Sequence, residues 1–452
     1  MLQLNGLQLT GRGRTCCDGL DRRRFLKAGF LGVAGLSLSD LLRREQAQAA
    51  AGRPASGKSV ILIWQHGGPS QLDTFDMKPL APAEVRGPFQ PVDTVVPGIR
   101  ISDQMPHHAQ VMDKLTILRG FSHDEGDHFA AAHWILTGYL GPNGSNRTPK
   151  NPSMGSVASQ IMGPRTTGVP SYVNINDGGF GFHGAAYLGV AHNPFRTGKF
   201  SYGNEGVQLA GSGDVSFELT EGLTDLALRN RMGLLERFDR LRRDVDQHGV
   251  FDGIDRIEQQ AADMLLSGRA RDAFDLEQED AATRERYGDG WGEQALLSRR
   301  LIEAGVRFVT LNTGYWDDHG NVDGALRNKL PRHDRALGVL VADLAERGML
   351  EDTLVITAGE FGRTPRINKD AGRDHWPRAQ SIALAGGGYA GGRIIGSTND
   401  KAEFPTSGAF GPNDFSTIIY HALGLDPRMT IDNFSGRPIA LLPSGQLPDG
   451  LV

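Results

Sequence analysis

Carboxylates and imidazoles follow several short apolar runs that lie far apart in the sequence. These groups are His66, Asp73 and Asp76; His123, Asp124, Asp127 and His128; Asp317, Asp318 and His319; and Glu360 with His375. Charged groups of this kind are costly to bury unless they are paired or coordinated. If each run is a strand of one open α/β sheet, its carboxyl end lies where such sheets bind ligands. The residues therefore predict one polar site assembled from several strand ends.

The spacing within two of these segments favours side chains that contact the same ligand or ion. Asp317 and His319 are two residues apart, so they point the same way on an extended segment. Asp124, Asp127 and His128 share one face if a helix begins there. Imidazole and carboxylate without thiolate suit Zn²⁺, Mn²⁺, Mg²⁺ or Ca²⁺. The number of ions stays open, because two ions that bridge the oxygens of a displacement also suit these residues.

Other polar residues have simpler interpretations. A lone histidine after a strand is more often a hydrogen-bonded loop residue than a ligand, and the remaining histidines are interpreted in that way. Asp76 is compatible with capping a turn, and Arg363 and Arg366 are compatible with solvation or with pairing to nearby acids. The joint placement of the acids and histidines at 317–319 and 360–375 favours contact with a metal or a substrate instead.

The elements that must position these residues alternate between strand and helix patterns. Short, continuously apolar runs occur at 60–64, 115–121, 171–177, 306–314, 352–360 and 380–388. Continuous runs, unlike alternating ones, predict strands that are covered on both faces. Between the runs, residues such as Leu337, Leu340, Val341 and Leu344 recur at helical spacing. We therefore predict an α/β fold, a three-layer sandwich around a mainly parallel central sheet.

The stretch 220–304 differs from the rest of the chain. It is strongly charged, lacks proline and carries apolar residues at helical spacing. This pattern predicts a helical insertion packed on the sheet. Residues 50–452 are then one α/β domain that contains the insertion.

The N-terminus has the pattern of an export signal. "RRRFLK" precedes an apolar stretch at 28–42, and Ala47 and Ala49 offer a small-x-small cleavage signal. The arrangement resembles a twin-arginine signal, which exports folded proteins. An N-terminal membrane anchor is the alternative, but the stretch is shorter than the ~20 residues that a span requires. We expect residues 1–49 to direct the protein to the periplasm or the extracellular space.

Composition and charge exclude several classes of chemistry and partner. Both cysteines, Cys16 and Cys17, lie in the leader, so the rest of the chain has no disulfide, no thiolate nucleophile and no cysteine ligand. The net charge of −5 argues against a nucleic-acid partner. No run after the leader is long and apolar enough to predict a transmembrane segment. The oligomeric state stays open.

Several motifs carry a resemblance to a known family. They are "GGPSQLDTFD", "DHFAAAHWILTG", "WDDHGN", and "GEFGRTPRIN" followed by "GRDHWP". Together they resemble the exported bacterial proteins grouped as domain-of-unknown-function family 1501, over nearly the whole chain after the leader. That family is similar to the alkaline-phosphatase-like superfamily, which includes sulfatases. The resemblance implies an alkaline-phosphatase-like fold with one or two metals at strand ends and a Thr, Ser or modified Cys nucleophile.

The resemblance also assigns metal-binding positions. An aspartate that follows the first strand in the superfamily has Asp73 as its nearest counterpart. "GEFG" replaces the usual Asp-His-Gly, so Phe361 stands where a histidine ligand is expected, which weakens one metal position. The ligands predicted for a divalent ion, Zn²⁺, Mn²⁺ or Ca²⁺, are Asp73, His128, Asp317, His319, Glu360 and His375.

Catalytic and substrate-binding residues follow from the same resemblance. The nucleophile position falls near Asp124, with Ser122 close by. Attack on the ester is predicted from Ser122, or from a metal-bound water activated by Asp124 or Asp127. Substrate contacts are predicted for His66, His123, Arg363 and Arg373. The arginines would recognise a phosphate, sulfate or uronate group, for which a planar bidentate donor is suited.

These residues favour an exported, metal-dependent hydrolase of phosphate or sulfate esters, with an anionic ester or polysaccharide as substrate. No C-x-P-x-R or S-x-P-x-R signature occurs, which disfavours a conventional sulfatase mechanism. One alternative is a catalytically degenerate protein of the same fold that binds glycan, envelope material or a protein partner. Another is an envelope scaffold whose 220–304 helices form the partner surface.

Overall fold

A mainly parallel sheet of eight strands forms the centre of the described chain. The computed structural model describes residues 57–142, 144, 148–176, 179–197 and 250–452. The strands in spatial order are β12 (Arg393–Ile395), β4 (Leu115–Phe121), β11 (Gln380–Ala385), β8 (Thr353–Ala358), β1 (Ser59–Trp64), β7 (Phe308–Asn312), β5 (Tyr172–Ile175) and β6 (Phe195–Thr197). β11 runs antiparallel to both of its neighbours, and the other pairs are parallel. The predicted sheet is thus confirmed.

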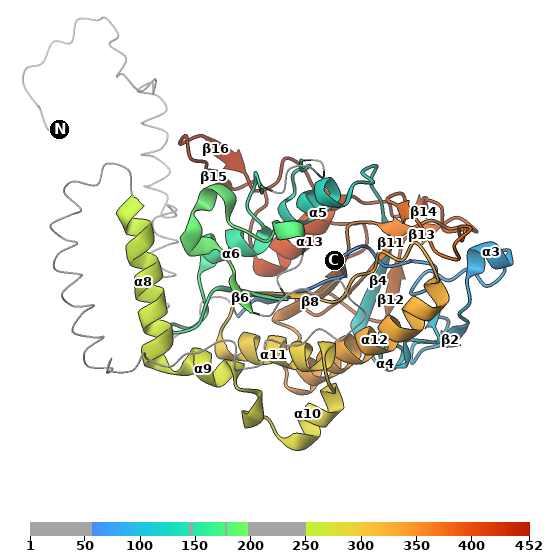
Figure 1. Cartoon of the computed structure of the whole chain (residues 1–452), viewed down its shortest axis with the longest axis horizontal. Helices are drawn as coiled ribbons and strands as arrows, with labels where there is room; N and C mark the ends of the chain where they lie inside the picture. The colour runs from blue at the N-terminus through green and yellow to red at the C-terminus, as the bar shows by residue number, and fades with distance from the viewer. Residues whose placement is uncertain (1–56, 143, 145–147, 177–178, 198–249) are drawn as a thin grey trace, which may run out of the picture. The chain divides into compact units, whose positions relative to one another are not determined.

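Helices cover both faces of this sheet, as Figure 1 shows. Along β1, Ile61 and Ile63 belong to one apolar cluster, whereas Val60 and Leu62 belong to another. The first cluster includes side chains of α4 (Pro106–Gln110), α11 (Trp291–Ala304) and α12 (Val322–Glu346). The second includes side chains of α5 (His128–Thr137), α6 (Met154–Met162) and α13 (Pro412–Leu423). Because strand side chains alternate between faces, this division confirms the three-layer sandwich.

The other described elements are four α-helices and four two-stranded ribbons, together with short 3-10 turns. The remaining α-helices are α3 (Ala83–Arg86), α8 (Val250–Ser267), α9 (Arg269–Phe274) and α10 (Ala281–Tyr287). Two-stranded ribbons pair β2 (Pro91–Asp93) with β3 (Arg100–Ser102), β9 (Gly362–Arg363) with β10 (His375–Trp376), β13 (Ser397–Thr398) with β14 (Pro405–Ser407), and β15 (Thr430–Asp432) with β16 (Pro438–Ala440). The β9–β10 ribbon carries two of the residues that the sequence places in the polar site.

Two predicted segments extend beyond the described residues. The leader at 1–49 lies outside them, and so does the first part of the predicted helical insertion, up to residue 249. The rest of that stretch forms α8 to α11, of which α11 packs on β7 and α12. The limits of the insertion therefore stay a prediction. No helix among the described residues combines the length and apolar character that crossing a bilayer requires.

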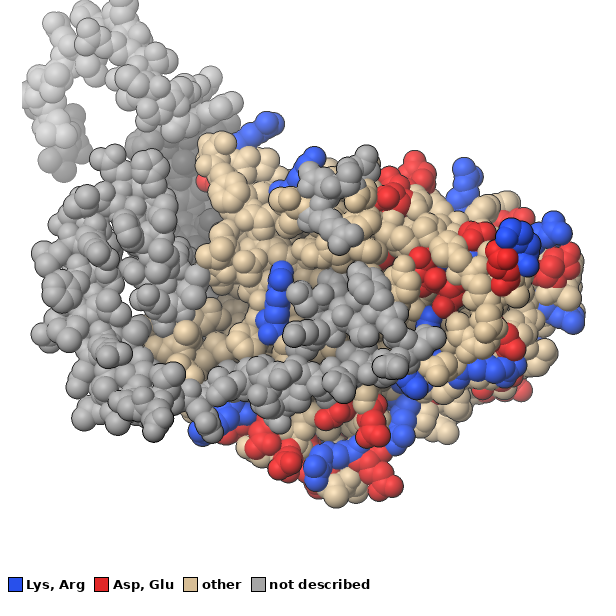
Figure 2. All heavy atoms as spheres, in the orientation of Figure 1, with Lys and Arg blue, Asp and Glu red and all other residues tan. Residues whose placement is uncertain are grey.

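Charged side chains of both signs share the surface. On the face shown in Figure 2, the described lysines and arginines are interspersed with aspartates and glutamates. This mixture is typical of a solvated surface, where neighbouring opposite charges interact weakly. The acids and histidines that the sequence places in the polar site are instead gathered near strand ends, and most of them are wholly or partly buried.

Candidate metal centre

Loops at one edge of the sheet bring the predicted polar residues together. Gly67 follows β1, Asp317 follows β7 and Glu360 follows β8. His128 is the first residue of α5, after the loop that follows β4, and His375 begins β10. Because β1, β7 and β8 are parallel neighbours, their carboxyl ends meet at this edge.

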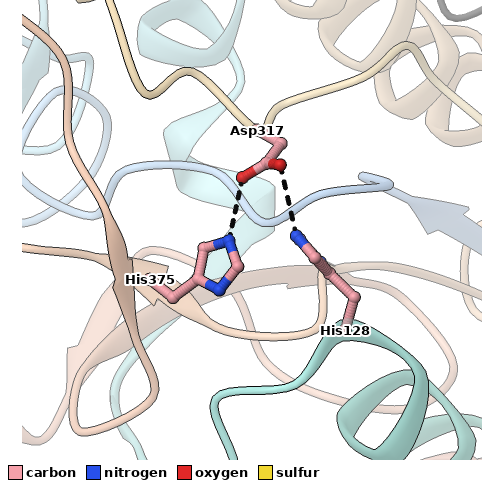
Figure 3. A group of neighbouring side chains, drawn as sticks. All are labelled: His128, Asp317 and His375. Atoms are coloured by element: carbon pink, nitrogen blue, oxygen red, sulfur yellow. Dashed lines mark hydrogen bonds and ion pairs between the residues drawn. The ribbon is translucent and has the colours of Figure 1, made fainter. Parts of the chain in front are cut away.

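Asp317 lies between His128 and His375 (Figure 3). Its Oδ2 atom is 3.3 Å from His128 Nε2, and its Oδ1 atom is 3.1 Å from His375 Nε2. One ligand atom from each of the three residues lies within 4.8 Å of the others. Two imidazoles and a carboxylate are a ligand set of catalytic Zn²⁺ sites, with further positions open for water or substrate. We call these three residues the triad.

The hydrogen bonds of the two imidazoles direct their Nε2 atoms toward a cation. His128 Nδ1 is 3.2 Å from Glu360 Oε1, and His375 Nδ1 is 3.0 Å from the carbonyl oxygen of Gly126. Both partners are acceptors, so Nδ1 carries the proton of each neutral ring. The Nε2 lone pairs then face the Asp317 carboxylate, and within the described part of the chain that carboxylate is the polar partner of the buried His128 Nε2 atom. The triad therefore fits a divalent metal ion.

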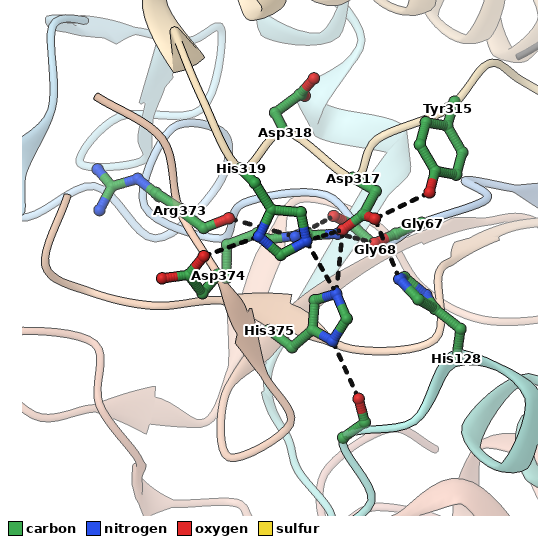
Figure 4. A network of polar contacts seen from close by, with 12 residues as sticks. Gly67, Gly68, His128, Tyr315, Asp317, Asp318, His319, Arg373, Asp374 and His375 are labelled. Carbon is green, nitrogen blue, oxygen red and sulfur yellow. Dashed lines mark hydrogen bonds and ion pairs between the residues drawn. The ribbon is translucent and has the colours of Figure 1, made fainter. Parts of the chain in front are cut away.

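Asp317 is kept ionised by its neighbours. Arg363 Nη2 lies 2.6 Å from its Oδ1 atom. The Tyr315 hydroxyl donates to its Oδ2 atom over 2.8 Å (Figure 4). Burial alone would raise the pKa of Asp317. The contacts with His128 and His375 and the charge of Arg363 outweigh burial and hold this pKa well below its usual range. The carboxylate is thus available as a ligand at any physiological pH.

Glu360 supports His128 from a fully buried position. Both of its carboxylate oxygens accept from the Gly67 amide, over 2.9 and 2.8 Å. Burial lowers the pKa of His128, but its contacts with Asp317 and Glu360 outweigh burial and raise that pKa to about 9. In the metal-free protein a proton therefore occupies the place that a cation would take, and metal binding must displace it.

His66 and His123, both predicted as substrate contacts, lie beside Glu360. His66 is 1% exposed and packs on Phe180, with 4.1 Å between ring centroids. The Nε2 atom of His123 is 2.8 Å from the carbonyl oxygen of Glu360. Burial is the main reason why the pKa of each histidine falls to about 4. Both are neutral at pH 7, and their contact with substrate stays a prediction.

The two arginines predicted to bind an anion are almost fully buried. Besides its contact with Asp317, Arg363 donates from Nε to the carbonyl oxygen of Gly68 over 3.0 Å. Arg373 pairs with Asp73 over 2.7 Å, and neither side chain is exposed. Asp73, predicted as a metal ligand, therefore lies in an ion pair outside the triad. The roles predicted for Asp73 and the arginines toward metal and substrate stay predictions.

The three predicted catalytic residues are not linked to the triad by any hydrogen bond or ion pair of the described residues. Asp127 is the N-cap of α5, and its carboxylate accepts from the amides of Phe129 and Ala130, both over 3.0 Å. This is a preferred role for an aspartate before a helix. Asp124 is exposed and Ser122 is half-buried. Their part in catalysis stays a prediction.

His319 approaches the triad from a more exposed position. Its Nε2 atom is 2.9 Å from Asp317 Oδ1 and 3.2 Å from His375 Nε2. Its Nδ1 atom is 2.7 Å from Asp374 Oδ1 (Figure 4). The side chain is 47% exposed, whereas that of His128 is 14% exposed. The structure thus gathers three of the other predicted ligands, His128, His319 and His375, at Asp317. Glu360 contacts His128, and Asp73 lies apart in its pair with Arg373.

Three contributions to the site were not predicted from the sequence. They are the Tyr315 hydroxyl, the Asp374 carboxylate and the Gly126 carbonyl oxygen. Tyr315 lies two residues before Asp317, and Asp374 directly precedes His375 in "GRDHWP", so proximity in the sequence was an available signal for both. Gly126 carried no such signal, because every residue has a carbonyl group.

Comparison with known families assigns the chain to one of them. A model of the family described as "Protein of unknown function (DUF1501)" matches residues 57–450. The chain belongs to this family. The resemblance of the sequence motifs is thereby confirmed over nearly all of the chain after the leader. No curated protein matches the sequence.

Solved structures to which the chain is similar include a sulfatase, a lipoteichoic acid synthase and an alkaline phosphatase. The PsFucS1 sulfatase from Pseudoalteromonas sp. aligns at 13% identity and a TM-score of 0.38, over 84% of this chain and 70% of that one. The lipoteichoic acid synthase LtaP from Listeria monocytogenes aligns at 13% and 0.39, over 86% and 75%. The alkaline phosphatase from the Antarctic bacterium TAB5 aligns at 12% and 0.36, over 82% and 99%. At such identities, the chemistry must be argued from the chain's own residues.

Proposed function

We propose that this protein is an exported, metal-dependent hydrolase of phosphate or sulfate esters, acting on an anionic ester or polysaccharide outside the cytoplasm. The observation that supports it most is the convergence of the triad, in which two Nε2 atoms face one ionised carboxylate at 3.1 and 3.3 Å. The leader, with its arginines before an apolar stretch, supports the export part of the proposal.

His128, Asp317 and His375 would hold the divalent ion, Zn²⁺, Mn²⁺ or Ca²⁺. Such an ion, when bound, supplies a Lewis acid for an ester oxygen. The chain's own residues prepare this site. Arg363 keeps Asp317 ionised and oriented through its 2.6 Å contact, and Glu360 fixes the ring of His128.

The nucleophile of the proposed reaction is the Ser122 hydroxyl or a water molecule. Ser122 follows β4 and is half-buried, so it lies at the same strand-end edge as the triad. For a water, Asp124 or Asp127 would accept the proton. Asp124 is exposed and has no capping role, whereas the Asp127 carboxylate already accepts two amide protons of α5. Asp124 is therefore the better placed of the two bases.

A second candidate function is a metal-bearing protein that binds glycan, envelope material or a partner without turnover. The observation that favours it is the absence of any hydrogen bond or ion pair, among the described residues, between the triad and Ser122, Asp124 or Asp127. Hydrolysis needs a nucleophile or base that can reach the reacting atom. Binding needs only the metal centre.

The test of the proposal begins with the metal content of gently purified protein without its leader, measured by elemental analysis. The same preparation is then assayed on a panel of phosphate and sulfate esters. We expect bound Zn²⁺, Mn²⁺ or Ca²⁺, and turnover that falls by more than about 100-fold in Asp317→Asn and His375→Ala. Asp426→Asn is the matched control, because Asp426 is exposed and, among the described residues, its carboxylate pairs with Arg428 alone.

The outcomes separate the candidates. Metal together with turnover that both triad variants lose supports the hydrolase. Metal without turnover on any ester of the panel favours the binding protein, especially if a chelator lowers the melting temperature. No metal, even after reconstitution, overturns the metal centre and both candidates that depend on it.

A further inference from the structure

Asp374 and His319 form a pair at the exposed side of the triad. His319 Nδ1 is 2.7 Å from Asp374 Oδ1, while His319 Nε2 points to Asp317 Oδ1 at 2.9 Å and to His375 Nε2 at 3.2 Å (Figure 4). Asp374 is 52% exposed. An exposed carboxylate has no need of a partner, so its fixed contact with His319 requires an explanation.

The loop around Asp374 holds its carboxylate in place. Its amide donates to Thr364 Oγ1 over 2.9 Å, and the Thr364 amide donates back to its carbonyl oxygen over 2.9 Å. The side-chain amide of Asn368 donates to Asp374 Oδ1 over 3.1 Å. The Oδ1 atom and the backbone of Asp374 are thus both restrained. The carboxylate therefore faces His319 in one position.

When the rings of His319 and His375 are neutral, the positions of their protons make the contact between the two Nε2 atoms unfavourable without a cation. A carboxylate accepts only, so the 2.7 Å contact with Asp374 places the proton of a neutral His319 on Nδ1. The contact of His375 Nδ1 with the Gly126 carbonyl oxygen does the same for that ring. Two Nε2 lone pairs then meet at 3.2 Å, both beside Asp317 Oδ1. A cation bound between them would satisfy both lone pairs and would also face Asp317 Oδ1, which already contacts Arg363.

We propose that Asp374 is a positioning residue that holds His319 as a fourth donor to the metal centre, through the Asp374–His319–metal arrangement. This inference rests on the proposed function, because it requires the triad to bind metal. It gives a site of three imidazoles and one carboxylate. Such a nitrogen-rich set favours Zn²⁺ or a similar transition metal, whereas Ca²⁺ and Mg²⁺ prefer sites made of oxygen ligands.

The exposure of the pair separates this role from a structural one. Exposed ion pairs contribute little to folding, so loss of the Asp374 carboxylate should leave the metal-free protein about as stable as before. A carboxylate that orients a metal-bound histidine instead affects metal affinity, typically by about 10–100-fold. Metal affinity and stability without metal are therefore the two quantities to compare.

The experiment measures the Zn²⁺ dissociation constant of the leaderless protein by competition with a chromophoric chelator. We expect Asp374→Ala to weaken Zn²⁺ binding by about 10–100-fold, with the melting temperature of the metal-free protein unchanged. Asp374→Asn keeps an acceptor oxygen and should retain most of the affinity. Asp370→Ala is the matched control, because Asp370 is 62% exposed in the same loop and its carboxylate has Lys369 as its one polar partner in the described part of the chain.

Three further measurements test the role of His319 and the nature of the site. His319→Ala and the double variant His319→Ala/Asp374→Ala should bind Zn²⁺ equally, because Asp374 acts only through that ring. With Co²⁺ as the probe, wild type should give the intense visible absorption of a four-coordinate site, and Asp374→Ala should lose part of it. Excess Ca²⁺ should leave bound Zn²⁺ in place.

The failure of this inference differs from the failure of the proposed function. If Asp374→Ala binds Zn²⁺ as tightly as wild type while Asp317→Asn does not bind it, the positioning role is overturned and the triad stands. If the double variant is much weaker than His319→Ala, Asp374 does not act through His319 and the inference is overturned. If wild type binds no Zn²⁺, the proposed metal centre fails and this inference fails with it.

Discussion

The carboxylate of Asp317 contacts five side chains, which are His128, His319, His375, Arg363 and Tyr315. Three of these residues offer imidazole nitrogens, and the other two hold the carboxylate through hydrogen bonds. Arg363 is itself fixed by the Gly68 carbonyl oxygen. A ligand restrained in this way loses little conformational entropy when a metal binds, which favours binding.

At the residue scale, the buried pair of Asp73 and Arg373 can be tested for a role in stability, as opposed to a role in binding metal or substrate. Arg373→Leu leaves the Asp73 charge buried without its partner, and we expect a loss of about 3–5 kcal/mol in the free energy of unfolding. Adding Asp73→Asn removes that charge and should recover part of the loss. Urea unfolding of the two variants, both metal-free, measures this difference.

The matched control for this pair is an exposed one. Arg428 is 89% exposed and pairs with Asp426, so Arg428→Leu should leave the urea midpoint nearly unchanged. An Arg373→Leu variant that unfolds at the wild-type urea midpoint would show that the buried pair does not contribute to stability. In that case the substrate role predicted for Arg373 from the sequence would become the better interpretation.

The sequence could identify the residue types of the site but not their partners. Carboxylates and histidines after apolar runs predicted the meeting of Asp317, His319, Glu360 and His375, because strand ends of a parallel sheet share one edge. The pairing of Asp73 with Arg373 joins residues 300 positions apart. No local pattern distinguishes such an aspartate from a metal ligand, since both are buried carboxylates near a cation.

At the scale of elements, α12 and α11 position the loop that carries Asp317. Trp316 is buried between Trp291 of α11, with 6.0 Å between ring centroids, and His333 of α12, with 5.4 Å. The amine of Lys329, also on α12, donates to the Tyr315 carbonyl oxygen and to the Asp318 carboxylate. These contacts lie on both sides of Asp317, so the helix layer fixes the loop from the protein interior.

Lys329→Met tests this dependence of the loop on α12. Methionine keeps the apolar stem but removes the amine that holds Tyr315 and Asp318. We expect a loss of about 1–3 kcal/mol in the free energy of unfolding, because a partly buried carbonyl and carboxylate lose their donor. Zn²⁺ affinity should also fall, since Asp317 loses a support on either side.

Arg327→Met on the same helix is the control for Lys329→Met. Arg327 pairs with Asp323 at the surface, where both side chains are 52% exposed, so Zn²⁺ affinity should not change. Competition with a chelator measures the affinities, and urea unfolding measures stability. If Lys329→Met binds Zn²⁺ as wild type does, the loop keeps its position without this contact.

The sequence predicted the main elements because a strand buried on both faces is continuously apolar, as β1 and β8 are. It did not predict that β11 runs antiparallel, because an antiparallel strand in the middle of a covered sheet has the same composition as a parallel one. β6 was also missed. It has three residues, one of them exposed, and so lacks a continuous apolar run.

At the scale of the whole molecule, fully buried histidines set the response to acid. Burial is the main cause that lowers the pKa of His183 and that of His333 to about 3. In the unfolded chain each has the ordinary pKa of 6.5. As the pH falls below 6.5, the unfolded state binds protons that the folded state does not bind. Stability should therefore decrease from pH 6.5 toward pH 3.

His333→Leu tests this linkage at a site outside the metal centre. Each histidine whose pKa falls from 6.5 to about 3 destabilises the fold at pH 5, relative to pH 7, by about 2 kcal/mol. The leucine variant cannot bind that proton, so its loss between the two pH values should be smaller than the wild-type loss by that amount. His183→Leu should behave in the same way. Urea unfolding of the three metal-free proteins at pH 7 and pH 5 gives the three differences required. An equal loss in wild type and in both variants would mean that these histidines are protonated in the folded state as readily as in the unfolded chain, and that acid acts on the fold through other groups.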